Sequence, residues 1–217
     1  TVKSIVSLGA APCFNQFAMV LVQITMNNSL RYYGGLSPYG SEIPLACVGV
    51  ITKLNIVFMA CTIGIAQGCQ PIFGYNYGAG NLARVRKTFL TAAVIETAIS
   101  SVSFILFQLF PRQIISIFGQ GNEAYFAFAT RYLRIYMFLV FLIGFQQLCS
   151  NFFTAIGKAK LGIMMSLTRQ IIFLLPLILI FPIFMGIDGI MYAGPIADAA
   201  AVLLAAFFAV RELRKMR

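Results

Sequence analysis

The chain has 217 residues, of which 60% are hydrophobic and only 10% are charged, and its formal net charge is +10. Its mean hydropathy is +0.88, whereas about a quarter of the residues in a soluble domain are charged. These values exclude an ordinary soluble domain and indicate an integral membrane protein.

Six apolar runs are long enough to cross a bilayer as helices, which takes roughly 20 residues each. The runs are continuous rather than alternating, so they predict an all-α membrane protein and not a spanning β-barrel. The predicted spans are residues 5–30, 43–73, 88–110, 132–153, 161–185 and 187–210, which we expect to form a single six-helix lobe over residues 1–217. The chain starts without Met directly before a span, so we expect a fragment or one half of a larger protein.

Basic residues gather on one side of this predicted bundle, the side that holds both termini and the second and fourth loops. That side carries ten of them: Lys3, Arg84, Arg86, Lys87, Lys158, Lys160, Arg211, Arg214, Lys215 and Arg217. The other side has Arg31 and Arg112, while Lys53, Arg131, Arg134 and Arg169 lie within or beside spans. The positive-inside rule therefore predicts that both termini are cytoplasmic. We expect the protein to lie in the cell membrane, in a bacterium the inner membrane. No aromatic-basic patch accompanies these charges, so nucleic acid is not an expected partner.

The first span carries a polar stripe. Gln16, Gln23 and Asn27 fall on one helical face, and Asn15 adjoins it. Amides that face lipid are costly, so this face should meet another helix or a watery substrate cavity.

The second span adds two amides, Asn55 and Gln70, and leads into the turn QPIFGYNYGAGNLARVRKTF. We expect the turn motif to comprise Gly74, Tyr75, Asn76, Gly78 and Gly80. Its glycines allow a turn without a Cβ penalty, and Asn76 and Asn81 can hydrogen-bond the turn backbone. Neither GxGxxG nor GxxxxGK[ST] spacing is met, which argues against a phosphate-binding loop.

Two acidic residues lie near the middle of predicted spans, Glu96 in the third and Asp198 in the sixth. An ionisable group at that depth is a functional hypothesis by default. Glu96 shares a helical face with Ser100 and could exchange a proton, whereas Asp198 could equally make a helix-packing hydrogen bond. Both are candidates for ion coupling, and we expect at least one of them to be neutral part of the time.

The fourth span carries a second polar stripe. Gln147 and Asn151 share a face, and Gln146 lies beside it. Tyr136 could present its ring face to a cationic ligand, a contact worth about 0.5 to 2 kcal/mol. These residues are further candidates for the substrate cavity, with ordinary packing between helices as the alternative.

Histidine is absent, and the five cysteines lie singly within apolar runs. A histidine-based metal site or catalytic triad is therefore excluded, and we expect no metal and no cofactor. Without paired carboxylates on one helix face or a nucleophile with a base, an enzyme is the least favoured class.

The run AQGCQPIFGYNYGAGNLARVRKTF closely resembles the signature between the eighth and ninth helices of MATE transporters, the multidrug and toxic compound extrusion family. Three further stretches resemble the family in the same order: LRYYGG, NFFTAIGKAK and GIDGIMYAGPIADAAA. The resemblance runs nearly from end to end of the chain.

This resemblance implies a twelve-helix bundle of two similar lobes, with this chain as the C-terminal lobe, helices seven to twelve. It implies a proton- or sodium-coupled antiporter that exports amphipathic organic, often cationic, compounds by alternating access. The N-terminal lobe, where similar members usually carry proton-linked aspartates, is missing. The expected partner is therefore that lobe or a second copy of the chain.

Two alternatives remain open beside an antiporter. A flippase of the same superfamily for lipid-linked sugars would need cationic residues in its cavity, for which Lys53, Arg134 and Arg169 are the candidates. A truncated membrane subunit without transport activity would instead associate stably with other chains.

Overall fold

The computed structural model describes the backbone of residues 2–216 and the side chains of residues 16–158 and 160–216. Its helices are α1 (Val2–Gly35), α2 (Glu42–Gly78), α3 (Leu82–Leu109), α4 (Pro111–Phe118), α5 (Glu123–Tyr136), α6 (Val140–Ala155), α7 (Ala159–Leu167), the π-helical segment η1 (Thr168–Leu174), α8 (Leu175–Met185) and α9 (Ile187–Lys215). No strand occurs in this described part, so the prediction of an all-α protein is confirmed.

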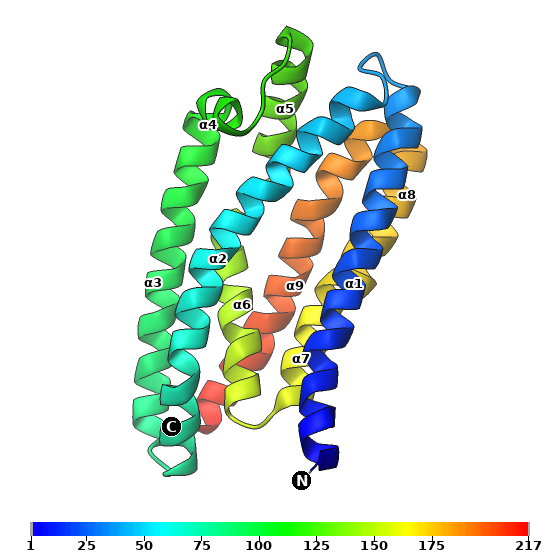
Figure 1. Cartoon of the computed structure of the whole chain (residues 1–217). Helices are drawn as coiled ribbons and strands as arrows, with labels where there is room; N and C mark the ends of the chain where they lie inside the picture. The colour runs from blue at the N-terminus through cyan, green and yellow to red at the C-terminus, as the bar shows by residue number, and fades with distance from the viewer. Residues whose placement is uncertain (1, 217) are drawn as a thin grey trace.

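The long helices run roughly side by side along one axis (Figure 1). The start of α1, the α2–α3 turn, the α6–α7 turn and the end of α9 lie at one end of this bundle. We call it the basic end, because it carries Arg84, Arg86, Lys87, Lys158, Lys160, Arg211, Arg214 and Lys215. The α1–α2 loop, α4, the start of α5 and the α8–α9 turn lie at the opposite end.

Four helical stretches among the described residues are long and apolar enough to cross a membrane: α2, α3, residues 160–185 and α9. The bent pair of α5 and α6 makes a fifth if it is counted as one span. The first predicted span lies in α1 and is not among them, and the side chains of residues 1–15 are outside the described part. The structure therefore supports four or five of the six predicted spans.

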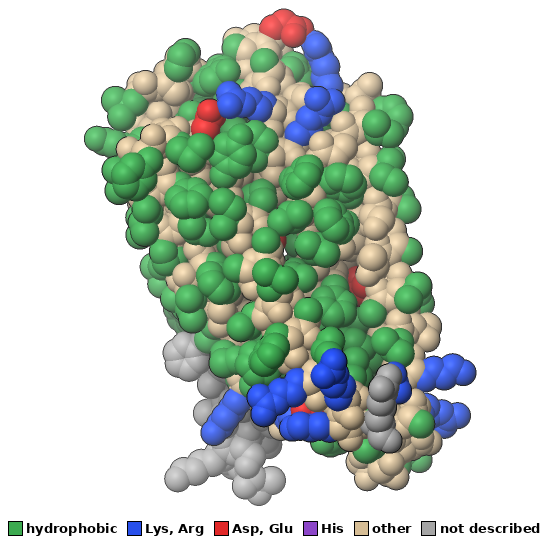
Figure 2. Space-filling model, turned by 180° about the vertical axis from the view of Figure 1, so that it is seen from behind, with side chains coloured by type: hydrophobic (Ala, Val, Ile, Leu, Met, Phe, Trp, Pro, Cys, Tyr) green, Lys and Arg blue, Asp and Glu red, His purple; other side chains and the backbone are tan. Residues whose placement is uncertain are grey.

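An apolar band separates the charged ends of the bundle (Figure 2). Large hydrophobic side chains on several helices are exposed there, for example Phe17, Val94 and Leu203. Exposed apolar surface of this extent is typical of a protein that contacts lipid.

The fourth predicted span is not one continuous helix over residues 132–153. Helix α5 begins earlier, at Glu123, and α6 follows it at an angle of 48° after a break at Met137–Leu139, which we call the α5–α6 break. Tight turns form the break, since the Phe138 amide donates to Ile135 at 3.1 Å and the Val140 amide to Met137 at 3.2 Å. No proline or glycine marks these residues, so nothing in the sequence signals the bend.

The glycine-rich turn between α2 and α3 is shorter than predicted. Gly74 and Gly78 are still helical, and of the predicted glycines Gly80 alone has a positive φ, +73°. The Asn81 amide donates to Asn76 and the Gly80 amide to Tyr77, which is the Schellman pattern that closes a helix on a left-handed residue. Asn81 then caps α3 by accepting from the Arg84 amide at 3.3 Å. The predicted role of Asn81 is confirmed, whereas Asn76 bonds within its own helix, to Ile72 at 2.8 Å.

The fifth predicted span contains the π-helical segment η1 between α7 and α8. Pro176 lies just after it and cannot donate a backbone hydrogen bond, so the helix next to it must readjust. Short π-helical stretches within α-helices are frequent at functional sites. Here the segment carries Arg169.

Candidate functional site

Three of the predicted cavity residues meet between α2 and α6. The Gln70 amide nitrogen donates to Asn151 Oδ1 at 2.6 Å. Asn151 in turn donates to the Gln147 backbone carbonyl, one turn earlier, at 2.9 Å. The three residues are partly buried, and the Gln70–Asn151 bond joins the two helices.

The stripe on α1 is partly exposed. Gln23 Nε2 donates to Asn27 Oδ1 at 3.1 Å, and both residues are half-buried. Gln16 is exposed, while the side chain of Asn15 lies outside the described residues. This face of α1 therefore presents amides at the surface of the lobe.

Three other predicted cavity residues point into the protein or are packed closely. Gln146 is buried and donates to the Met165 carbonyl at 3.5 Å. The Asn55 Oδ1 atom is buried without a partner among the described residues. Tyr136 stacks on Tyr132 with ring centroids 5.4 Å apart.

Asp198 forms an ion pair with Arg169 inside the bundle. Arg169 Nε donates to Asp198 Oδ1 at 2.6 Å, and the side chains are only 13% and 4% exposed. The pair joins η1 to α9. Tyr136 packs on the same helix one turn before Asp198, because a Cβ on Gly194 would approach the Tyr136 ring to 2.5 Å. Sequence reasoning missed Arg169 as the partner, although a second charge within a neighbouring span was the available signal.

Glu96 has a different environment, between α3 and α6. The residue is fully buried, and neither carboxylate oxygen has a hydrogen-bond partner in the described structure. Ser100, one turn further along α3, is equally buried, and its hydroxyl is unpartnered too. Both groups face Gly144 of α6, since a Cβ there would lie 2.6 Å from Ser100 Oγ and 2.8 Å from Glu96 Oε2.

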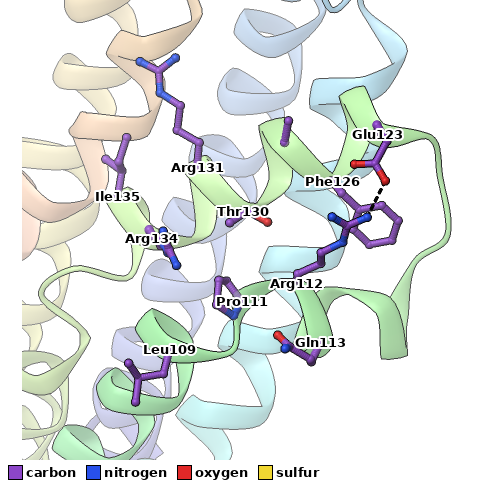
Figure 3. A pocket seen from close by; sticks show the side chains of 11 residues that line it. Leu109, Pro111, Arg112, Gln113, Glu123, Phe126, Thr130, Arg131, Arg134 and Ile135 are labelled. Carbon is purple, nitrogen blue, oxygen red and sulfur yellow. Dashed lines mark hydrogen bonds and ion pairs between the residues drawn. The ribbon is translucent and has the colours of Figure 1, made fainter.

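A cavity of about 600 Å³ lies at the opposite end, between the end of α3, α4 and α5 (Figure 3). Arg112, Arg131 and Arg134 line it. Arg112 pairs with Glu123 at 2.6 Å, and its guanidinium carbon lies 5.2 Å from the centre of the Phe126 ring. Arg131 pairs with Asp188 at 2.7 Å. Two of the three guanidinium groups are thus neutralised, and the third, on Arg134, is exposed.

The charges at the two ends are unequal. The basic end has eight described basic residues and one acidic residue, Glu212, which pairs with Lys158 and so ties the α6–α7 turn to α9. Arg131 and Arg134, which the sequence analysis assigned to neither side of the membrane, lie at the opposite end. Its four basic residues lie among three acidic ones: Glu42, Glu123 and Asp188. The asymmetry predicted from the sequence therefore persists in the folded bundle.

Comparison with protein families decides the class of this molecule. The family model described as MatE matches residues 9–186, most of the chain. This chain belongs to the MatE family. The resemblance noted in the sequence is therefore confirmed, and MatE proteins are transporters rather than enzymes.

Solved MATE structures share the fold of this MatE chain. The multidrug transporter DinF-BH is 31% identical, with a TM-score of 0.83 over 97% of this chain and 46% of its own. An outward-facing multidrug resistance MATE transporter is 17% identical, with a TM-score of 0.87 over 99% of this chain and 47% of its own. An inward-facing one is also 17% identical, with a TM-score of 0.84 over 99% and 48%. No curated protein matches the sequence.

The chain thus spans about half the length of the solved transporters that it matches. This MatE chain is a multi-pass membrane protein with the fold of one lobe. Its described residues contain no group of three or more histidine, cysteine, aspartate or glutamate side chains that could hold a metal ion. Among the described residues, the buried polar groups of the candidate site are the amides, the Arg169–Asp198 pair and Glu96 with Ser100.

Proposed function

We propose that this chain is the C-terminal lobe of a cation-coupled multidrug antiporter, which exports amphipathic organic compounds, often cationic ones, by alternating access. The observation that carries the proposal is the match of 97% to 99% of the chain to one half of MATE transporters. The coupling ion is H⁺ or Na⁺, and the missing half is an N-terminal lobe or a second copy of this chain.

The lobe crosses the membrane six times, with α5 and α6 as one bent span and both termini in the cytoplasm. The basic end supports this orientation, since lysine and arginine are enriched in cytoplasmic loops. In a bacterium, the inner membrane is the expected location. A fluorescent protein fused after Lys215 should fluoresce, and alkaline phosphatase fused there should be inactive. The reverse pattern would contradict the orientation.

The substrate path follows the polar residues of α1, α2 and α6. Support comes from the amides of α1 at the lobe surface and from the Gln70–Asn151 contact. The full set of proposed cavity residues is Asn15, Gln16, Gln23, Asn27, Asn55, Gln70, Tyr136, Gln146, Gln147 and Asn151. Similar TM-scores to outward-facing and inward-facing structures suit a lobe that moves largely as a rigid body.

A lipid-linked sugar flippase is less well supported, because its pyrophosphate substrate needs free cations along the path. Of the three candidates, Arg169 is already paired with Asp198, and Arg134 lines the cavity at the opposite end. Lys53 is exposed on α2 and is the remaining candidate.

Ethidium efflux tests the proposal. The chain is expressed alone and together with the N-terminal lobe of the 31% identical transporter, in cells without their own efflux pumps. We expect efflux in at least one of these two arms. The efflux should stop when a protonophore removes the proton gradient, if H⁺ is the coupling ion, or when the sodium gradient is removed, if Na⁺ is. A chain that is inserted and folded but gives no gradient-dependent efflux in either arm would contradict an antiporter lobe and favour the truncated subunit.

A further inference from the structure

Glu96 lies halfway along α3 with nothing among the described residues to compensate a negative charge. It is fourteen residues into the 28-residue helix α3, about 21 Å along a helix that rises ~1.5 Å per residue. Its side chain is fully buried, and both carboxylate oxygens are unpartnered in the described structure. An isolated carboxylate in such a place carries a desolvation penalty of several kcal/mol, so its neutral form is favoured.

Within the part of the chain that the structure describes, no opposite charge faces Glu96 from the helices packed around it. Helix α6 contains no Asp, Glu, Lys or Arg, and Cys149 is its one titratable residue. On α2, Cys69 is the titratable residue close to Glu96. Of the two charged residues of α2, Glu42 is in the first turn, at the opposite end, and Lys53 lies about three turns further along the helix, where its side chain is exposed.

The remaining charged residues on neighbouring helices also lie at the ends of the bundle. Those of α4 and α5 line or border the cavity at the opposite end: Arg112, Glu123, Arg131 and Arg134. Those of α3 itself lie in its first turns, at the basic end: Arg84, Arg86 and Lys87. A proton is therefore the available means of neutralising Glu96.

A metal cation fits this place poorly. Hard cations such as Mg²⁺ and Ca²⁺ take about six to eight oxygen ligands. The unpartnered oxygens that meet here are the two of Glu96 and the Ser100 hydroxyl. A protonated carboxyl needs less, because it carries no charge and has a single O–H to satisfy.

The helix that covers Glu96 is the one that bends. Gly144 lies in the second turn of α6, shortly after the α5–α6 break, and a methyl group there would touch both Glu96 and Ser100. A movement of α6 away from α3 would separate Gly144 from Glu96 and Ser100 and admit water to the carboxyl.

We propose that Glu96 is a proton-binding site of this lobe, occupied while α6 packs on α3 and emptied to water when α6 moves at the α5–α6 break. Binding converts the carboxylate and one proton from water into the carboxylic acid, and release reverses this. The role of the site in transport rests on the proposed function. The binding site itself does not, so its test needs no transport.

Infrared difference spectroscopy of the whole chain in lipid, near neutral pH, tests the site. Exposed carboxyls are ionised there, so we expect a protonated-carboxyl band that Glu96→Gln removes and Asp198→Asn leaves. Ser100→Ala should shift this band without abolishing it. A spectrum without the band, or a band unchanged by Glu96→Gln, would overturn the proposal. Loss of the band on adding Na⁺ at constant pH would also overturn it, in favour of a metal cation site.

Amide hydrogen exchange tests the link to α6. The comparison is between wild type and Glu96→Gln at each pH, because the intrinsic effect of pH on exchange is then the same for both. At alkaline pH, we expect faster exchange over residues 137–145 in wild type than in the variant, by several-fold. Equal exchange in the two proteins at every pH would remove the proposed coupling between Glu96 and α6.

Discussion

Asp198 and Glu96 are the same kind of group at similar depths in the same bundle, yet their surroundings are opposite. Asp198 on α9 accepts a hydrogen bond from Arg169 at 2.6 Å, whereas Glu96 on α3 faces Gly144 and has no partner among the described residues. The difference shows that burial alone does not define what a membrane carboxyl does. Asp198 has an opposite charge within hydrogen-bond distance, whereas Glu96 has none and is the carboxyl that we propose binds a proton.

The two surroundings also differ in how the helices pack. The Arg169–Asp198 pair crosses from the π-helical segment to α9, next to the aromatic stack of Tyr132 and Tyr136. Glu96 instead depends on a glycine, because only a residue without a side chain lets α6 approach so closely. Four substitutions can break or sharpen this contrast.

Arg169→Met should have the largest effect, because it leaves Asp198 buried without its cation. We expect the free energy of unfolding to fall by about 3 to 5 kcal/mol, as when one member of a buried ion pair is removed. SDS titration followed by circular dichroism measures it. The double variant Arg169→Met with Asp198→Leu should recover most of the loss, since no charge then remains buried. A single variant as stable as wild type would mean that the pair does not hold α9 to η1.

Gly144→Ala should be the next most damaging, because it overpacks the contact with Glu96 and Ser100. Inserting a methyl group into a well-packed interior typically costs about 1 to 3 kcal/mol. The same titration measures this loss. Gly49→Ala on α2 is the matched control, since a Cβ there meets nothing within 4 Å and alanine is the better helix former. Equal effects of the two substitutions would contradict close packing at Gly144.

Glu96→Gln should change stability little, by less than about 1 kcal/mol, the scale of one hydrogen bond. Glutamine has the size of glutamic acid and is neutral, like the protonated form that we propose for Glu96. Asp198→Asn is the comparison, and we expect it to cost more because the Arg169 charge loses its counter-charge. Thermal unfolding of the two variants beside wild type gives both shifts. A larger loss for Glu96→Gln than for Asp198→Asn would reverse the assignment.

Arg112→Gln should have the smallest effect, although it also removes an arginine–carboxylate pair. The side chains of Arg112 and Glu123 are 59% and 82% exposed, and exposed pairs contribute about 0 to 1 kcal/mol. We expect a loss near the lower limit, which high salt should abolish in the unfolding titration. A loss as large as that of Arg169→Met would show that burial does not set the strength of these pairs.

Most of the helices could be predicted from the sequence, and the candidate sites only in part. Asn81 was predicted to bond the turn backbone and does so. The break at Met137–Leu139 could not be predicted, because no proline or glycine is present and the bend depends on packing. The predicted amides on α2 and α6 include the Gln70–Asn151 contact, but their spacing could not show which of them meet.

The sequence by itself determined the class of the molecule, its apolar helices and its charge asymmetry, because these follow from composition and from local backbone preferences. It also marked Glu96 and Asp198 as ionisable residues near the middle of predicted spans. The tertiary structure alone decided that Asp198 meets Arg169 and that Glu96 and Ser100 meet Gly144. Such pairings join residues 29 to 48 positions apart, and only the packing of helices brings them within reach.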